Sequence, residues 1–427
     1  NVYSHLALNA VLEKYQYLEK KERAFITRVT EGTLEHMIEL DYILNQFSKV
    51  KVNKMKPVIR NILRSAVYQL KYMDSVPDSA VCNEAVKLAV KKGFGTLRGF
   101  VNGVLRNVAR GLDQVEYPAE GIERLSVVYS MPEWILKLWK KTYDLDVIES
   151  MLQAFQEETP VTIRCNLAKT TPENLKESLQ KEGVTVTPHP YLSYAFRIQD
   201  YDHLSELESF QKGEFYVQDI SSMLVGELAD PKKGDRVIDV CAAPGGKALH
   251  VAEKLRGTGS VEARDLSLYK VGLITENIER SGLMNIHAVQ KDATVCDADV
   301  KDAADLVIAD LPCSGLGVLA KKTDLKYKAT EQGTKELAGL QREILKNAAS
   351  YVRPGGTLIY STCTINPAEN IENVHWFLKE FPEFVLDPIA DRLCSTLQNS
   401  VEEAGCLQLL PGIHKSDGFF IARFGKK

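Results

Sequence analysis

Two cysteines stand where a side chain could do chemistry, because each directly follows an apolar stretch. Cys313 comes three residues after Asp310 in a Pro-containing loop, and Cys363 ends the segment Ser361-Thr362-Cys363. A cysteine thiolate is strongly nucleophilic near neutral pH and is a good leaving group afterwards. Cytosine needs such a group, because its carbon-5 attacks a methyl donor only after a nucleophile has added at carbon-6. The pair therefore favours thiolate-assisted methyl transfer to cytosine.

A glycine-bearing loop upstream of the cysteines is the second chemical feature. A short β-branched strand, 236–240, leads into it, and a helix is expected to begin near Ala248. Small residues let a ligand approach the backbone, and a helix N-terminus offers N–H groups at the carboxyl edge of a sheet. A Gly-Gly pair is also compatible with an ordinary tight turn. The loop reads Cys241-Ala242-Ala243-Pro244-Gly245-Gly246-Lys247.

Acidic residues after the next two strands strengthen the prediction of a nucleotide-like ligand. Asp265 lies about 20 residues beyond the loop, where an acceptor for ribose hydroxyls is expected. Asp292 follows the third strand at the same edge, where adenine would lie, although a cap or turn role is the commoner one for such a residue. The loop lacks the Gly-Lys-Ser/Thr ending and the Gly-x-Gly-x-x-Gly pattern, which disfavours ATP hydrolysis and nicotinamide chemistry. S-adenosylmethionine is therefore the expected cofactor.

The elements that must position these residues follow from the spacing of apolar residues. Residues 1–112 show the three- and four-residue spacing of an all-helical domain, and 113–130 read as a linker. Residues 131–214 predict a helical pair and a small α+β module, and 215–427 alternate strand and helix. Such alternation predicts a mostly parallel, doubly wound α/β sheet, with both cysteines facing one crevice. The predicted strands of that sheet are 236–240, 260–264, 285–289, 304–310 and 356–361.

The net charge of -4 hides an asymmetry between the two parts of the chain. Residues 1–110 contain 18 Lys and Arg against 10 Asp and Glu, whereas the remainder contains 35 against 47. Residues 49–73 and 85–110 contain no acid at all. A solvated helix face explains one such stretch equally well. Two of them beside a nucleotide-chemistry motif favour binding of a nucleic acid.

Composition and cysteine spacing exclude several classes of protein. With 44% hydrophobic and 26% charged residues, the chain is typical of soluble globular proteins. Its eight cysteines show no Cys-x-x-Cys and no zinc-type Cys/His spacing, so neither a metal site nor a disulfide framework is expected. No membrane span or signal peptide is indicated, which favours a reducing cytoplasm. We also expect residues upstream of Asn1, because the chain does not begin with Met.

Specific motifs then carry a resemblance that covers nearly the whole chain. They are Val217-Gln218-Asp219-Ile220-Ser221-Ser222, Asp239 to Lys247, Asp310-Leu311-Pro312-Cys313-Ser314-Gly315, Ser361-Thr362-Cys363 with Asn366-Pro367 and Glu369-Asn370, and Asp417-Gly418-Phe419-Phe420. With these the chain resembles the Sun/Fmu (RsmB-like) family of RNA cytosine-5 methyltransferases, which modify small-subunit (16S) ribosomal RNA. The resemblance implies a C-terminal Rossmann-like class I methyltransferase domain, a small RRM-like α+β module and an all-α NusB-like RNA-binding domain. It implies S-adenosylmethionine as cofactor and ribosomal RNA as partner, and we expect a monomer.

The resemblance also implies roles that the residues alone leave open. It makes Cys363 the nucleophile and lets Cys313 assist breakdown of the covalent product, as or beside the base that removes the carbon-5 proton. DNA cytosine methyltransferases instead use the cysteine of their Pro-Cys loop as nucleophile. Asp310 is placed either at the methionine end of the cofactor or at the protonated ring nitrogen of the base, and Lys247 is expected to orient the same region. Cys241 lines the cofactor loop and is expected to be structural.

One departure from the family pattern and two rival functions remain. The family's Arg-x-Pro-Asp-x-x-Trp motif is replaced here by residues 321–327. These still offer a cation for the RNA backbone and the aromatic Tyr327 for stacking on a base.

A tRNA cytosine-5 methyltransferase would need another RNA-binding region, and the basic helical domain argues against it. A non-catalytic RNA-binding assembly factor would not need both cysteines and an intact cofactor loop.

Overall fold

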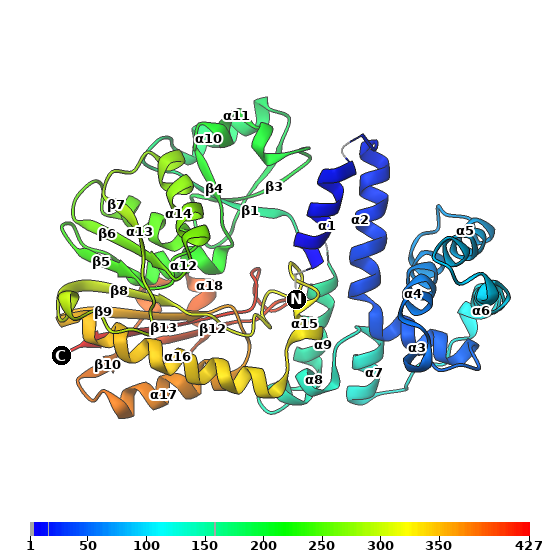
Figure 1. The fold of residues 1–427 in the computed structure, drawn as a ribbon. Helices are drawn as coiled ribbons and strands as arrows, with labels where there is room; N and C mark the ends of the chain where they lie inside the picture. Colours follow the sequence, from blue (N-terminus) through cyan, green and yellow to red (C-terminus); the bar gives the residue numbers. More distant parts are fainter. Residues whose placement is uncertain (1–3, 16, 158) are drawn as a thin grey trace. The chain divides into compact units, whose positions relative to one another are not determined.

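The computed structural model describes residues 4–15, 17–157 and 159–427, which form two compact units (Figure 1). The first unit comprises Asn1–Gln156 together with Leu319–Lys328. The second comprises Glu157–Val318 and Ala329–Lys427. The chain therefore leaves the second unit just after the Cys313 loop and returns ten residues later.

The N-terminal part of the first unit is helical, as the apolar spacing predicts. Helix α4 shows the reason: Ile59, Ile62, Leu63 and Ala66 recur at three- and four-residue spacing, and all are buried in one core. The segment expected as a linker contains a further helix, α7. The helices are α1 (Ser4–Leu12), α2 (Lys20–Glu35), α3 (Met37–Phe47), α4 (Pro57–Tyr72), α5 (Asp78–Lys91), α6 (Arg98–Gly111), α7 (Gly121–Val128), α8 (Glu133–Trp139) and α9 (Leu145–Gln156).

The segment Leu319–Lys328 packs within the first unit and ends in the short helix α15 (Leu325–Lys328). Lys326 is buried there and its Nζ donates to the carbonyl of Glu35 at 2.8 Å. Burial lowers the pKa of Lys326 to about 8, against the raising effect of Glu35. The Tyr327 hydroxyl also donates to the Glu35 carbonyl, at 3.3 Å. The Tyr327 side chain is half-buried, so a stacking contact of its ring with RNA stays a prediction.

The second unit begins with a small antiparallel sheet of order β2-β3-β1-β4. Its strands are β1 (Val161–Cys165), β2 (Thr185–Pro188), β3 (Ala195–Gln199) and β4 (Phe215–Val217), with helices α10 (Pro172–Lys181) and α11 (Glu208–Gln211). The Thr171 side chain caps α10 by accepting from the backbone N–H of Asn174, and Pro172 occupies the first turn. Strand β4 pairs with β1, so this module extends beyond residue 214.

The large sheet of the second unit has the order β11-β12-β13-β9-β8-β5-β6-β7, with β10 beside β13. Strands β7, β6, β5, β8 and β9 run parallel, which confirms the predicted doubly wound α/β core. The antiparallel extension by β10 to β13 was not predicted. The strands are β5 (Arg236–Asp239), β6 (Ser260–Asp265), β7 (Ile286–Gln290), β8 (Ala304–Asp310), β9 (Val352–Thr362), β10 (Phe384–Leu386), β11 (Val401–Glu403), β12 (Cys406–Leu409) and β13 (Phe419–Lys426).

Helices cover both faces of this sheet, because alternate residues of each strand point to opposite sides. Val237 of β5 packs in the core beneath α12, α13 and α14, whereas Ile238 packs in the core beneath α16 and α17 (Figure 1). These helices are α12 (Ile220–Ala229), α13 (Gly246–Lys254), α14 (Leu268–Ser281), α16 (Glu331–Tyr351) and α17 (Ile371–Glu380), and the short α18 (Ser395–Gln398) follows. The parallel strands therefore end at one edge, where ligands of such sheets bind.

Candidate active site

The two sequence-predicted cysteines lie together at this edge. Strands β8 and β9 are parallel neighbours, with Asp310 beside Ser361, and Cys313 and Cys363 follow in the two adjoining loops. Their Sγ atoms are 3.2 Å apart and both side chains are half-buried. All eight cysteines lie among the described residues, and none is in a disulfide. The arrangement can present two thiols to one reacting ring.

The environment distinguishes the two sulfurs. The pKa of Cys313 is raised well above its usual value, first by its hydrogen bond to Cys363, then by burial and by the negative charges of Cys363 and Glu369. Cys313 is therefore the sulfur that keeps its proton.

A buried carboxylate ties the two cysteine loops together. Glu369 is fully buried and follows Cys363 in the loop after β9. It accepts hydrogen bonds from the Ser314 backbone N–H at 2.8 Å and from the Ser314 hydroxyl at 2.6 Å. Gln341 of α16 and Asn366 donate their side-chain amides to it at 3.0 and 2.8 Å. The sequence motif contained Glu369, but this role depends on the tertiary structure.

Close backbone packing holds the same loops from the other side. The Gly317 N–H donates to the carbonyl of Cys363 at 3.0 Å, and the Gly418 N–H donates to the carbonyl of Gly317 at 2.8 Å. A Cβ atom on Gly317 would lie 1.9 Å from the Gly418 oxygen. A Cβ atom on Gly418 would lie 2.7 Å from the Gly317 Cα, so glycine is required at both positions, which gives the Asp417 to Phe420 motif a steric reason.

Lys247 and Asp310 form an ion pair beside the cysteines. The Lys247 Nζ lies 2.7 Å from Asp310 Oδ2, and the Ser361 hydroxyl donates to Asp310 Oδ1 at 2.7 Å. Burial acts to lower the pKa of Lys247, but Asp310 and the further negative charges of Asp239 and Cys363 outweigh it and raise the pKa. Lys247 therefore stays cationic, and its charge can stabilise a thiolate on Cys363.

The predicted cofactor loop runs from β5 to the N-terminus of α13. The Ala242 N–H donates to the carbonyl of Arg264 at 2.7 Å, and the Gly245 N–H donates to that of Ala242 at 2.6 Å. Gly245 caps α13 with φ +107°, a left-handed conformation that favours glycine. Asn277 of α14 donates its side-chain amide to the Pro244 carbonyl at 3.0 Å. Burial raises the pKa of Cys241 strongly, which agrees with a structural thiol.

Two carboxylates at the ends of β5 and β6 border this loop. Asp265 is buried and accepts the backbone N–H groups of Ala243 and Leu266 at 3.1 and 2.8 Å. Asp239 is fully buried, and its Oδ2 atom has no hydrogen-bond partner. Burial and then the charge of Asp310 raise the pKa of Asp239 to about 7. Asp239 stands in the sequence motif but was not predicted as a site residue, although an acid at the end of an apolar strand is a signal of this kind.

Asp292 occupies a different environment after β7. It is exposed, and its Oδ1 accepts from the backbone N–H and the hydroxyl of Thr294 at 2.9 and 2.7 Å. These bonds lower its pKa. The carboxylate therefore stabilises a turn, and a contact with adenine stays a prediction.

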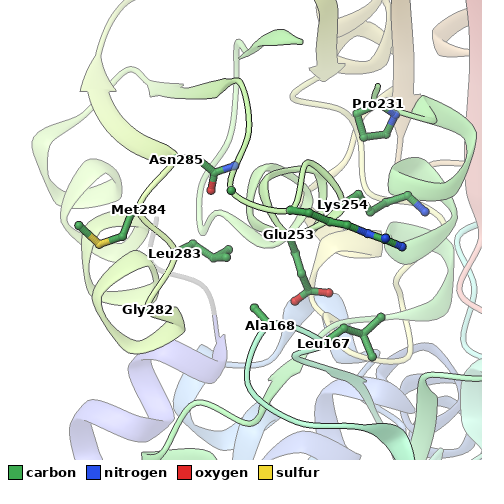
Figure 2. A pocket seen from close by; sticks show the side chains of 11 residues that line it. Leu167, Ala168, Pro231, Glu253, Lys254, Gly282, Leu283, Met284 and Asn285 are labelled. Carbon is green, nitrogen blue, oxygen red and sulfur yellow. The ribbon is translucent and has the colours of Figure 1, made fainter. Parts of the chain in front are cut away.

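A pocket of about 740 Å³ in the second unit lies away from these residues (Figure 2). Its lining comes from the ends of α13 and α14, where β6 and β7 begin, and from Leu167 and Ala168 after β1. Figure 2 shows Glu253 and Asn285 among the lining side chains. The pocket thus lies toward the amino ends of the strands and contains none of the sequence-predicted site residues.

Metal and membrane sites are not indicated in the described part of the chain. Residues 4–15, 17–157 and 159–427 contain no group of three or more His, Cys, Asp or Glu side chains that could hold a metal ion. None of the helices described has the length and apolar character needed to cross a membrane.

Comparison with known proteins gives matches over the same parts of the chain. The model of the 16S rRNA methyltransferase RsmB/F family matches residues 227–425. The NusB family matches residues 2–110, and the ferredoxin-like domain of RsmF/B-like methyltransferases matches residues 131–202. The all-α domain, the small α+β module and the methyltransferase domain predicted from the sequence are thereby confirmed.

Similar proteins cover nearly the full length of the chain. The probable ribosomal RNA small subunit methyltransferase B of Bacillus subtilis (strain 168) is 37% identical, over 100% of this chain and 95% of that protein. The probable ribosomal RNA small subunit methyltransferase B of Synechocystis sp. is 33% identical, over 99% of this chain and 95% of that protein. The crystal structure of PH0851 superposes with a TM-score of 0.83 and 26% sequence identity, over 98% of this chain and 93% of that chain. The crystal structure of NSun6 from Pyrococcus horikoshii with SFG has a TM-score of 0.61 and 25% sequence identity, over 69% of this chain and 98% of that chain. The chain therefore belongs to the ribosomal RNA small subunit methyltransferase B family, whose catalytic domain has the S-adenosylmethionine-dependent methyltransferase fold.

Proposed function

We propose that the protein transfers a methyl group from S-adenosylmethionine to carbon-5 of a cytosine in small-subunit (16S) ribosomal RNA. The reaction passes through a covalent bond between Cys363 and carbon-6 of that cytosine. The observation that carries this proposal is the pair of sulfurs 3.2 Å apart beside the cofactor loop. The names of the curated relatives support ribosomal RNA of the small subunit as the substrate.

Cys363 acts as the nucleophile, because its partner Cys313 has a raised pKa and keeps its proton. Lys247 supports the thiolate electrostatically. Asp310 accepts from its ammonium group and is itself held by the Ser361 hydroxyl. Addition of the thiolate to carbon-6 moves electron density to carbon-5, which can then attack an electrophilic methyl group. The bound S-adenosylmethionine supplies that methyl group.

Cys313 removes the carbon-5 proton after methylation. Its pKa is raised first by the hydrogen bond to Cys363 and also by the charge on Cys363. Once Cys363 is bonded to carbon-6 it carries no charge, so these two causes disappear, the pKa of Cys313 falls, and Cys313 can pass its proton to water. The Cys313 thiolate then takes the proton, carbon-5 and carbon-6 regain their double bond, and Cys363 leaves.

The residues around the cofactor loop fit S-adenosylmethionine. This cofactor carries a sulfonium and an ammonium group, and the carboxylates of Asp265 and Asp310 lie near enough to that of Asp239 to raise its pKa. The buried Oδ2 of Asp239 lacks a hydrogen-bond partner in the protein, so a cationic donor would satisfy it. Asp265 is assigned to the ribose hydroxyls and Asp292 to the adenine region, while the N-terminus of α13 and the loop from Cys241 to Gly246 approach the methionine part.

Exposed cations of the first unit support binding of RNA. Arg64 and Lys71 form ion pairs with Asp41 and Glu39, but most of the other cations in the two acid-free stretches are exposed. The exposed members are Lys49, Lys51, Lys54, Lys56, Lys87, Lys91, Lys92, Arg98, Arg106 and Arg110. Such a surface binds phosphates and positions the RNA, while the target cytosine must leave its stack to reach the sulfurs.

The test is transfer of a labelled methyl group to unmodified 16S ribosomal RNA, with tRNA as the comparison substrate. Digestion of the product should yield labelled 5-methylcytidine. Cys363→Ala should abolish transfer, and Cys313→Ala should accumulate an RNA adduct that survives denaturing electrophoresis. An adduct formed by Cys363→Ala and not by Cys313→Ala would reverse the two roles, and label on tRNA alone would overturn the substrate.

A further inference from the structure

We propose that Cys313 and Cys363 form a reversible disulfide when a peroxide reaches the site, which makes the pair an oxidation site as well as a catalytic one. The consequence for activity rests on the proposed function, but formation of the bond does not. The pair differs from a lone reactive cysteine because the second sulfur is already in contact with the first.

The distance between the two sulfurs brings the pair within reach of a disulfide. Neighbouring strands lie about 4.8 Å apart, and the two loops leave β8 and β9 from the paired positions Asp310 and Ser361. The Sγ atoms must approach from 3.2 Å to about 2.05 Å, a change that side-chain rotation can provide. Glu369 and Ser314 hold the loops in register, so the thiols stay in this position when no substrate is bound.

The chemistry balances with hydrogen peroxide as the only added reagent. The Cys363 thiolate attacks one peroxide oxygen, the O–O bond breaks, and Cys363 becomes a sulfenic acid while hydroxide leaves. The Cys313 sulfur then attacks the Cys363 sulfur, the S–S bond forms, and the S–O bond breaks. The departing hydroxide takes the Cys313 proton, so two thiols and one peroxide give one disulfide and two waters.

The second sulfur also protects the first from irreversible damage. A sulfenic acid with no thiol beside it is oxidised further to a sulfinic acid, which thiols do not reduce. With Cys313 in contact, Cys363 is captured as a disulfide that a dithiol can reduce. An enzyme whose nucleophile must be reactive and partly exposed would thereby recover after oxidative stress.

The experiment uses the reduced full chain treated with hydrogen peroxide, then alkylated, digested with trypsin and analysed by mass spectrometry. Cleavage after Lys and Arg places Cys313 alone in peptide 302–321 and Cys363 alone in peptide 347–379. We expect these two peptides to appear cross-linked, lighter than their sum by two hydrogen atoms. Dithiothreitol should separate them again.

Two variants serve as controls. Cys296 is exposed and lies in a separate peptide, 292–301, so Cys296→Ser should leave both cross-link and activity unchanged. Cys313→Ser should give no cross-link, and Cys363 should accumulate as sulfinic acid that dithiothreitol does not reverse. In the wild type, methyl transfer should be lost in parallel with cross-linking and return on reduction.

Sulfinic acid at Cys363 in the wild type without a cross-link would overturn the proposal. So would cross-linking of either cysteine to Cys296. If the cross-link forms and the reduced protein transfers no methyl group to RNA, the oxidation site stands and the proposed function fails. If methyl transfer is active and insensitive to peroxide, the oxidation site fails and the proposed function stands.

Discussion

Ser314 and Glu369 are joined by two hydrogen bonds, one from the serine backbone N–H at 2.8 Å and one from its hydroxyl at 2.6 Å. Ser314 follows Cys313, and Glu369 lies in the loop that begins at Cys363. A single buried carboxylate therefore fixes the loop of one cysteine to the loop of the other.

Glu369→Gln should loosen the two cysteine loops. The glutamine places an N–H₂ group among side chains and a backbone N–H that donate, and an unsatisfied buried donor costs about 1–3 kcal/mol. Hydrogen exchange at Ser314 should become roughly tenfold faster or more, and methyl transfer should fall. Glu372→Gln, on the exposed side of α17, is the matched control. Unchanged exchange at Ser314 would show that Glu369 does not hold the loops.

Lys247→Met should make Cys363 react only at higher pH. Removing the cation removes an interaction that favours the thiolate, so alkylation of Cys363 by iodoacetamide at pH 7 should slow roughly tenfold. Mass spectrometry of peptide 347–379 measures that rate directly. Lys254→Met, which alters an ion pair of the same helix with Glu227, should leave the rate unchanged. Equal rates in the wild type and Lys247→Met would remove Lys247 from the reaction.

Asp239 should make binding of S-adenosylmethionine depend on pH. Its pKa of about 7 means that the carboxyl is largely protonated at pH 6 and ionised at pH 8. A cationic ligand favours the ionised form, so affinity should rise across this range, by about tenfold per pH unit at most. Asp239→Asn should bind more weakly at pH 8 and with no such rise, whereas Asp292→Asn should keep it. Calorimetry checks this, and a flat wild-type profile would contradict it.

The same carboxyl should influence stability in the absence of cofactor. Its pKa in the folded chain, about 7, is above the value of about 3.9 expected in the unfolded chain. The folded state therefore binds the proton more tightly, and this contribution to the free energy of unfolding is lost as pH rises from about 4 to about 7. Urea unfolding at several pH values should show that the free energy of unfolding of Asp239→Asn falls less over this pH range than that of the wild type. A variant that loses as much stability as the wild type would exclude the effect.

Lys91 and Lys92 should contribute to RNA affinity through charge. Both are exposed at the end of α5, and neither is part of the catalytic site. Replacing both by Glu should weaken binding of a 16S ribosomal RNA fragment roughly tenfold and reduce the dependence of affinity on salt. Lys301→Glu, an exposed lysine of the second unit, is the control. Filter binding at several salt concentrations decides the matter, and an unchanged salt slope would exclude these lysines from phosphate contacts.

Local patterns were sufficient to predict the elements that carry the site. The spacing of Ile59, Ile62 and Leu63 predicted α4, and β-branched runs before Cys241 and Cys313 predicted β5 and β8. The parallel order of strands then brought the two cysteine loops to one edge, because alternating strands and helices leave few topologies. These features depend on neighbours in the sequence, so the sequence alone determined them.

Long-range pairing decided what local pattern could not. A three-residue strand such as β4 has no local signal for its partner, and its place beside β1 follows from packing of the small sheet. Likewise, no local pattern at 321–327 predicted that the Tyr327 hydroxyl donates to the Glu35 carbonyl inside the first unit. Whether an apolar segment is exposed depends on what covers it in the folded chain.

The sequence by itself determined the chemistry that is possible here: two thiols, a glycine-bearing loop and acids at strand ends. Only the tertiary structure decided that the sulfurs lie 3.2 Å apart, that Glu369 connects their loops and that Asp239 has a pKa of about 7. The physical reason is that burial, hydrogen bonds and nearby charges come from residues far apart in the chain. Residue types define which groups can react, and folding sets their protonation and their distance.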